Sequence, residues 1–435
     1  MGSLKGVEIT TGSVGASSAA PDTAPSALIS NAPAIANNVI VNTVYEITTV
    51  AQAEALGITS DYDIQNDVVL HQHIVDFFSM VDEGTSFRFM LTDAATPADS
   101  LADVNLQYAK KLIVAADGAI RNFSLGWNIP AASDPETLID GMNGLIRAAI
   151  PQAQLLADWA ADTNRPIHVF LEGRRLSDTL SSALNLRNIL VSGVLLEAPN
   201  VSIVAGQDWD YAEARKTNAN VPINSKVHYY AAVGKVLGTV ASAEMNQSIG
   251  EVATFNLSDA VRGYFLTGGL SNHMKLQDVD DFLSGLDDNG YIFPISLKTS
   301  AISGLRWNND HVCIPIVIDA DGNINEHMIY YVRTMNEATR SLRDSMLLQL
   351  KRRYPANPST GQLTTASVKL LESVGNKVFS SYVQYGFISD GTTTVDATSD
   401  LITPPKTLLV DFEIVPTLIL DNISGTVRLK KSITV

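Results

Sequence analysis

Cysteine and long apolar runs are what this sequence of 435 residues has least of. Its single cysteine, Cys313, excludes an intrachain disulfide. It lies in HVCIPIVID, a stretch typical of a buried strand, where a thiol is inert. No run of about 18 apolar residues occurs, and the first residues contain no apolar segment like that of a secretory signal. We therefore expect a soluble protein made in the cytoplasm, without membrane insertion.

Basic residues are also scarce. The chain has 30 Lys and Arg against 46 Asp and Glu, a net charge of −16. Nucleic-acid binding needs a basic surface toward the phosphates, so this balance argues against a nucleic-acid partner. Hydrophobic residues make up 46% of the chain, which is ample for burial, and the length exceeds what one core normally holds. Two or more lobes are expected.

Signatures of catalysis and of cofactor binding are absent from the sequence. It contains no phosphate-binding G-x-x-x-x-G-K-[ST] loop, no G-x-S-x-G elbow and no H-E-x-x-H motif. His71 and His73 are two residues apart, so on a helix they point away from each other and do not share a metal. We predict no catalytic residue, no cofactor and no metal. An active site that forms only in three dimensions stays open as an alternative.

The middle of the chain alternates strand-like and helix-like segments, which predicts an α/β fold with a parallel or mixed sheet flanked by helices. A helix rich in small residues is expected at 226–244, and a hairpin turning at 321–322 is expected within 305–334. The other predicted strands are 41–49, 87–91, 120–127, 166–172, 201–206 and 291–299, and the other predicted helices are 67–81, 99–115, 136–162 and 277–287.

The N-terminus has the pattern of a short strand on a tether. In residues 6–10, Val7 and Ile9 alternate with polar neighbours, which favours a strand. Residues 11–27 are almost entirely Gly, Ser, Ala, Thr and Pro, and such a segment buries too little side chain to fold alone. The initial strand is thus available to a partner, and a frayed terminus is the alternative.

A basic helix is predicted at 335–354 in this acidic chain. Met335, Ala338, Leu342, Met346 and Leu350 fall on one face at helical spacing. Arg340, Arg343 and Lys351 lie within about 80° of one another on the helical wheel. This helix can dock on its own domain and present a basic stripe outward. The alternative is a solvated charged face with no partner.

The segments after the basic helix predict one more helix and two strands. Residues 365–385 form an amphipathic pattern followed by Gly386, a plausible helix terminator. Residues 408–420 alternate apolar and acidic side chains, as a half-buried strand does. In 425–435, Val427 and Leu429 alternate with Arg428 and Lys430. Both ends of the chain therefore offer extended strand arms.

The whole sequence resembles the contractile tail sheath family of phages, tailocins and related injection systems. The resemblance is carried by the arm GVEITTGSVGASSAAPDTAP, the segment YEITTVAQAEALGIT and the stretch LDDNGYIFPISLKTSAISGLRWNNDHVC. Its most specific part runs from MIYYVRTMNEATRSLRDSM through RRYPANPSTGQLTTASVKLLESVG to the terminal strands.

This resemblance implies a structural subunit without enzymatic activity, one that polymerises around an inner tube and contracts. It implies that 1–27 and 290–435 form an inner, tube-facing part and that 28–289 form outer lobes. Arg340, Arg343 and Lys351 would contact the tail tube protein, and Val7, Ile9, Val427 and Leu429 would join sheets of neighbouring subunits. The implied partners are further copies in stacked hexameric rings, the tube, the baseplate and terminal cap proteins.

The implied location is the bacterial cytoplasm during assembly and then the tail of the virion or injection particle. An α/β enzyme with an unrecognised active site, or a non-contractile phage structural protein, is the alternative.

Overall fold

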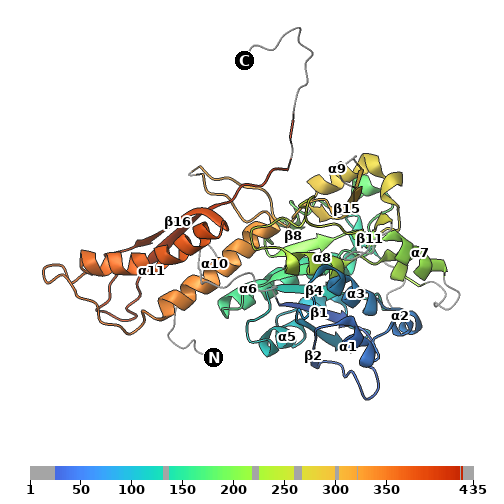
Figure 1. Cartoon of the computed structure of the whole chain (residues 1–435), viewed down its shortest axis with the longest axis horizontal. Coiled ribbons are helices and arrows are strands. Elements are labelled where there is room, and N and C mark those ends of the chain that lie inside the picture. Colours follow the sequence, from blue (N-terminus) through green and yellow to red (C-terminus); the bar gives the residue numbers. More distant parts are fainter. Residues whose placement is uncertain are drawn as a thin grey trace, which may run out of the picture.

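The chain folds into a large α/β lobe and a smaller, elongated lobe that share one long helix (Figure 1). This computed structural model describes residues 25–130, 137–217, 225–258, 267–298, 303–320, 322–421 and 423–424. The predicted α/β fold with a mixed sheet and flanking helices is confirmed. The predicted terminal strands, with Val7, Ile9, Val427 and Leu429, lie outside the described residues.

A seven-stranded sheet forms the centre of the large lobe, in the order β13-β10-β7-β4-β1-β3-β2. Only β2 runs antiparallel to its neighbour, β3. Residues of the inner strands are buried whichever face they point to, as in parallel sheets covered on both sides. The strands are β1 (Ser26–Asn31), β2 (Val44–Ile47), β3 (Phe87–Thr92), β4 (Asn122–Gly126), β7 (His168–Glu172), β10 (Val201–Val204) and β13 (Tyr291–Ile292).

Helices pack on the sheet in two groups. One group includes α4 (Ala98–Ala102), α5 (Ala109–Ala115) and α6 (Gly144–Asp162), and the other pairs α3 (His71–Met80) with α8 (Val233–Ser242). The predicted small-residue helix is α8, and it lies so close to α3 that a Cβ on Gly234 would come 2.2 Å from the carbonyl oxygen of His73. The remaining helices of this lobe are α1 (Val50–Ala55), α2 (Ser60–Asn66), α7 (Trp209–Thr217) and α9 (Asp280–Asp288), with 3-10 turns η2 (Leu180–Ser182), η3 (Val227–Tyr229) and η4 (Leu276–Asp278).

Short antiparallel ribbons surround the main sheet. Their strands are β5 (Leu138–Ile139) with β6 (Met142–Asn143), β8 (Leu190–Val191) with β9 (Val194–Leu195), β11 (Gly206–Asp208) with β12 (Gly268–Leu270), and β14 (Pro294–Lys298) with β15 (Ser303–Trp307). The hairpin predicted over 305–334 is less regular than expected: its described residues pair only through two isolated antiparallel bridges, Ile318 with Ile324 and His311 with Met328, and a helix already begins at Ile329.

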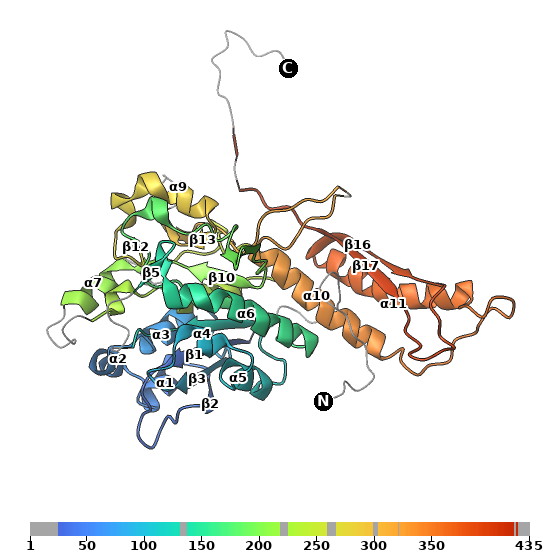
Figure 2. The ribbon, with the colours of Figure 1, turned by 180° about the vertical axis from the view of Figure 1, so that it is seen from behind.

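Helix α10 (Ile329–Leu347) connects the lobes. Its first turns, with Ile329 and Val332, lie in the large core, and its later turns, with Ala338, Leu342 and Met346, lie in the small core. The small lobe adds α11 (Thr365–Gln384) and a ribbon of β16 (Ile388–Val395) and β17 (Val410–Pro416) (Figure 2). Helix α11 and β17 match the segments predicted for them, including the turn at Gly386 with φ 76°.

The predicted domain boundaries at 27 and 290 stay predictions, and the described residues near both positions pack into the large lobe. Ser26 and Ala27 belong to β1, near the centre of the sheet. Leu305 and Trp307 share the core of the large lobe although they follow residue 290. The boundary between the large core and the small core falls within α10. The apolar residues at the start of this helix pack in the large lobe, and those farther along pack in the small lobe. Whether either lobe faces inward or outward in an assembly stays a prediction.

Candidate functional site

The carboxyl edge of the parallel sheet is where ligands bind in folds of this kind. The neighbours of β1 are β3 on one side and β4 on the other, so the chain changes direction beside β1. In doubly wound enzymes the crevice above such a point holds the substrate or cofactor. The polar residues there are Asn31 at the end of β1, Asn128 two residues after β4 and Glu172 at the end of β7.

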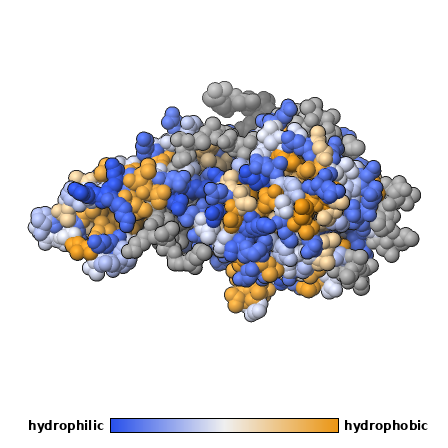
Figure 3. Space-filling model, turned by 90° about the horizontal axis from the view of Figure 1, so that it is seen from below, coloured by the Kyte–Doolittle hydropathy of each residue, from blue (hydrophilic) through white to orange (hydrophobic). Residues whose placement is uncertain are grey.

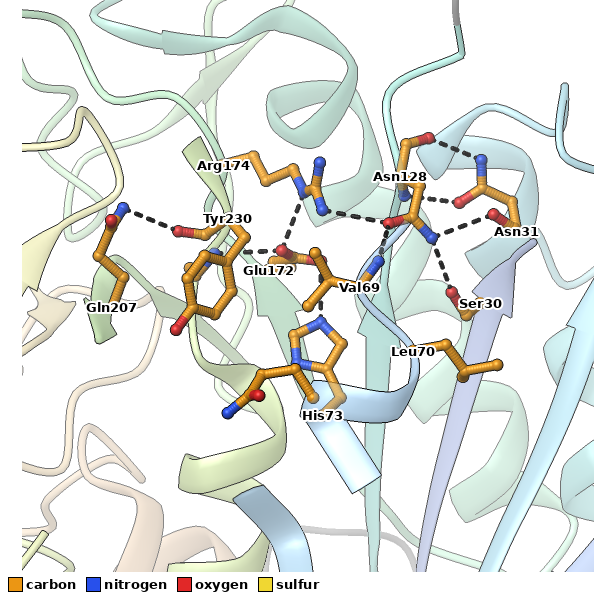
Figure 4. A network of polar contacts seen from close by, with 12 residues as sticks. Ser30, Asn31, Val69, Leu70, His73, Asn128, Glu172, Arg174, Gln207 and Tyr230 are labelled. Carbon is orange, nitrogen blue, oxygen red and sulfur yellow. Dashed lines mark hydrogen bonds and ion pairs between the residues drawn. The ribbon is translucent and has the colours of Figure 1, made fainter. Parts of the chain in front are cut away.

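In this protein the side chains of Asn31 and Asn128 occupy that position, and the two residues are hydrogen-bonded to each other (Figure 4). The side chain of Asn31 accepts from the backbone N–H of Asn128 at 2.7 Å and donates to its carbonyl at 2.7 Å. The amide group of Asn128 donates to Ser30 Oγ and to the Asn31 carbonyl, each at 3.1 Å. Its oxygen accepts from the N–H of Val69 and from Arg174. Both asparagine side chains are therefore committed to internal bonds.

A buried acid lies next to this pair. Glu172 accepts from Arg174 Nε at 2.9 Å and from the N–H of Ala231 at 3.1 Å, and His73 Nε2 is 3.4 Å from its other oxygen. Burial acts to raise the pKa of Glu172, but Arg174 and His73 outweigh it and hold this pKa below its ordinary value. Since Glu172 and His73 have no exposed surface, the group ties β7 to α3 and to the loop before α8.

This network is not apparent from the sequence alone. Its polar residues stand at or just after the ends of three buried strands, but only the strand order shows that those ends meet. Within the described residues, no group of three or more His, Cys, Asp or Glu side chains is placed to hold a metal ion. No helix there is long and apolar enough to cross a membrane.

The predicted basic stripe is not a surface stripe. Arg340 turns inward, where its guanidinium donates to the carbonyls of Gly118 at 2.7 Å, of Ile120 at 3.2 Å and of Pro166. Burial lowers the pKa of Arg340 to about 9. The expectation that Arg340 faces outward is wrong, because the helical wheel did not include the large lobe that packs against this side of α10.

The other two predicted cations are exposed to different degrees. Arg343 is partly exposed, with Nη1 3.8 Å from a carboxylate oxygen of Asp344. Lys351 lies beyond the end of α10 at φ 62°, exposed beside Arg352 and Arg353. The helix ends at Leu347, not at 354, so these three cations lie in the segment after the helix and not in a line along it.

One edge of the small ribbon is covered and the other is open. The N–H of Thr393 on β16 donates to Asn376 on α11 at 2.8 Å, and that of Gly391 donates to Asp390 at 2.8 Å. The N–H groups of Thr393 and Gly391 therefore point away from β17. Residues that face each other in an antiparallel pair either both bond across the pair or both point outward, so the N–H groups of their partners, Phe412 and Ile414, point away from β16. No described residue accepts from those two N–H groups, and the outer edge of β17 is open to another strand.

An extended segment follows β17 and leaves the lobe, as both ribbon views show (Figures 1 and 2). We call residues 417–424 the C-terminal arm. Its root is fixed, because the amide of Asn246 donates to Thr417 Oγ1 at 3.1 Å and to the carbonyl of Gly386 at 2.9 Å. Farther along, Leu418 and Leu420 are 88% and 79% exposed. Both leucine side chains are therefore almost fully in water in the isolated chain.

Comparison with known proteins gives a family for the chain. The profile of the DUF2586 N-terminal domain matches residues 7–296, two thirds of the chain. The chain belongs to the DUF2586 family. No curated protein matches it.

Solved structures similar to this DUF2586 protein come from contractile assemblies. Each comparison covers 99% of the chain. One is the helical sheath of the anti-feeding prophage in its contracted state, at 13% identity over 100% of that chain with a TM-score of 0.53. A second is from the six-fold symmetrised baseplate of the same particle, at 10% identity, 100% coverage and 0.54. A third is the PVC sheath complex of an extracellular contractile injection system in its contracted state. Here the sequence identity is 11%, the comparison covers 98% of that chain and the TM-score is 0.52. The DUF2586 chain thus has the fold of sheath proteins.

Proposed function

We propose that this DUF2586 protein is the sheath subunit of a contractile injection apparatus, which polymerises around an inner tube and drives it through a target envelope by contracting. The observation that carries the proposal is the open edge of β17 next to an arm with exposed leucines. Strand addition at such an edge links subunits through main-chain hydrogen bonds, which persist while the lobes move relative to one another. Head-to-tail contacts of this kind generate helical arrays.

The chemistry of β17 favours the C-terminal strand of a second copy as its occupant. On the α11 side β17 presents Phe412 and Ile414, and on the other side it presents Asp411 and Glu413 to solvent. Residues 425–435 carry the complementary pattern, with Val427 and Leu429 on one face and Arg428 and Lys430 on the other. Apolar pairs then meet over α11, and opposite charges meet on the exposed face.

The N-terminal strand fits the next position outward. Its apolar residues Val7 and Ile9 would continue the buried face. Its acidic residue, Glu8, would then face Arg428 and Lys430, whereas directly beside β17 it would face like charges. The proposed order is therefore β16, β17, the C-terminal strand of one neighbour and the N-terminal strand of another.

For the inner tube, the proposed contact is the basic segment at and after the end of α10. Lys351, Arg352 and Arg353 are exposed there, and Arg343 is partly exposed in the last turns of the helix. A cationic segment in a chain of net charge −16 suits an acidic tube surface. The further proposed partners are the baseplate, the terminal cap proteins and other copies in stacked, hexameric rings. Assembly would take place in the bacterial cytoplasm before the particle tail is complete.

An enzymatic function finds less support. At the carboxyl edge of the sheet, where a doubly wound enzyme binds its substrate, the polar side chains of Asn31, Asn128 and Glu172 are buried and bonded to one another or to the backbone. A non-contractile phage structural protein would share the strand linkage but form tubes of one fixed length.

A charge-swap experiment tests the proposed linkage. Reversing β17 with Asp411→Lys and Glu413→Lys, or the C-terminal strand with Arg428→Glu and Lys430→Glu, should each weaken self-assembly of the purified full chain. All four substitutions together with Glu8→Lys should restore assembly, because opposite charges then meet again on both sides of the C-terminal strand. Sedimentation and negative-stain electron microscopy measure the outcome. Equal assembly by all variants would show that the C-terminal strand does not occupy the edge of β17.

A further inference from the structure

A second exposed apolar element projects from the large lobe close to the root of the C-terminal arm. It is the loop of residues 315–326, which we call the finger. Asn325 holds its base, since its amide donates to the carbonyl of Pro315 at 2.7 Å and its side-chain oxygen accepts from the N–H of Val317 at 3.1 Å. Asp319 holds its turn by accepting from the N–H of Asn323 at 2.8 Å and from its amide group at 2.7 Å.

These polar contacts fix the finger without burying its apolar side chains. Ile316, Val317 and Ile318 are 54%, 49% and 67% exposed. Three successive branched aliphatic side chains cannot all be exposed on a strand that packs one face against its own protein. The finger therefore has a defined shape and an apolar surface on both faces, a combination that lowers the entropy cost of binding.

The finger lies beside the place where the arm leaves the molecule. At its base, burial lowers the pKa of His327 while the carboxylate of Asp421 in the arm acts in the opposite direction. Asp421 is therefore within electrostatic range of the finger base. Figures 1 and 2 show the finger and the arm projecting from the same part of the molecule, away from the central sheet.

We propose that the finger packs against a second copy of this chain, the same copy that receives residues 425–435. This inference rests on the proposed sheath function. Eleven residues follow the described end of the arm, and they span at most about 40 Å when extended. The copy that binds them must come within that reach of residue 424, on the side of the molecule from which the finger projects. The finger thus adds an apolar contact to a linkage that otherwise depends on one flexible arm.

The contact also differs from strand addition in its response to movement. A strand pair tolerates rotation of the lobes, whereas side chains packed on a fixed finger hold only one relative placement of two copies. The finger would stabilise one of the two packings that a contractile array needs, so its loss should change the balance between extended and contracted forms as well as the affinity.

The test compares three variants of the full chain with the wild type. Ile318→Asp places a charge on the finger at a position that costs little folding energy, because this side chain is mostly in water. Val114→Asp is the matched control: Val114 is 46% exposed on α5 of the large lobe, away from the finger. A third variant ends at residue 424. Circular dichroism checks folding, and sedimentation over a concentration series with electron microscopy measures assembly.

We expect Ile318→Asp to raise the concentration needed for assembly at least tenfold, Val114→Asp to leave it within twofold, and truncation at 424 to abolish assembly. If Ile318→Asp assembles like Val114→Asp while the truncation does not assemble, the finger inference is wrong and the sheath function stands. If the truncation assembles as the wild type does, or the wild type stays monomeric at every concentration, the proposed linkage itself fails.

Discussion

His168 is an uncharged ring in the centre of the main sheet. It lies on β7 with Nε2 2.9 Å from Ser202 Oγ on β10. Burial, together with the nearby cation of Arg333, lowers the pKa of His168 to about 3. In the unfolded chain a histidine takes up its proton at about pH 6.5. Between these two values the unfolded state binds a proton that the folded state does not, so acid favours unfolding.

For His168 we predict a loss of unfolding free energy of up to about 1.4 kcal/mol per pH unit as the pH falls below 6.5. Burial raises the pKa of Asp208 to about 7, and this carboxyl acts in the opposite direction in the same range. The wild type must therefore be compared with His168→Gln, which should lose less stability on acidification. Chemical denaturation at pH 6.5, 5.5 and 4.5 measures both slopes. Parallel slopes would mean that His168 is protonated in the folded protein.

Among the elements, α11 shows how closely helix and ribbon pack in the small lobe. Gly375 faces β16, and a Cβ at this position would lie 2.2 Å from Thr393 Oγ1. Gly-to-Ala changes in helix interiors ordinarily stabilise by about 0.5–1 kcal/mol. We predict the opposite sign for Gly375→Ala, a destabilisation of about 1–3 kcal/mol from the clash.

Gly285 in α9 provides the control for that prediction, since a Cβ there meets nothing within 4 Å. Gly285→Ala should raise the unfolding free energy by the usual amount. Thermal and urea denaturation of both variants, read by circular dichroism, give the two signs. Stabilisation by Gly375→Ala would mean that the ribbon shifts freely away from α11.

Helices and strands whose apolar residues recur at a clear helical or alternating spacing were predictable from the sequence. Elements whose burial depends on residues far away in the chain were not. The spacing of Leu371, Val378 and Tyr382 located α11, and the alternation around Phe412 located β17. Strand β1 was missed because SALISN continues the small and polar composition of the preceding segment. Helix α10 begins earlier than predicted because Ile329 and Val332 are buried by the large lobe, which hides the helical period there.

At the scale of the whole molecule, the two lobes are joined by polar contacts as well as by α10. Arg340 donates to carbonyls of the large lobe, and Glu337 forms an ion pair with Arg121. From below, apolar and polar side chains are mixed over both lobes, with one apolar group on the small lobe (Figure 3). No local pattern in the sequence indicates which cation joins the lobes and which stays outside, because that depends on the placement of whole lobes.

We predict that Arg340→Ala lowers the unfolding free energy by about 2–4 kcal/mol, since it removes a donor from three carbonyl oxygens, of which that of Gly118 keeps Arg121 as a donor. Amide hydrogen exchange should become faster around Gly118, Ile120 and Pro166. Arg343→Ala, three residues along the same helix and partly exposed, should change stability by less than about 0.5 kcal/mol. Similar exchange rates in both variants would argue that the lobes are held by apolar contacts alone.

The continuity of α10 has a mechanical consequence. A helix of 19 residues extends about 28 Å without a loop, and it is embedded in one core at each end. A load applied at the C-terminal arm therefore reaches the large lobe through a stiff rod, with no joint at which it could dissipate. Asn246 reinforces this route because it bonds the root of the arm directly to the large lobe. A torque applied to the arm should then rotate the whole molecule as one rigid body.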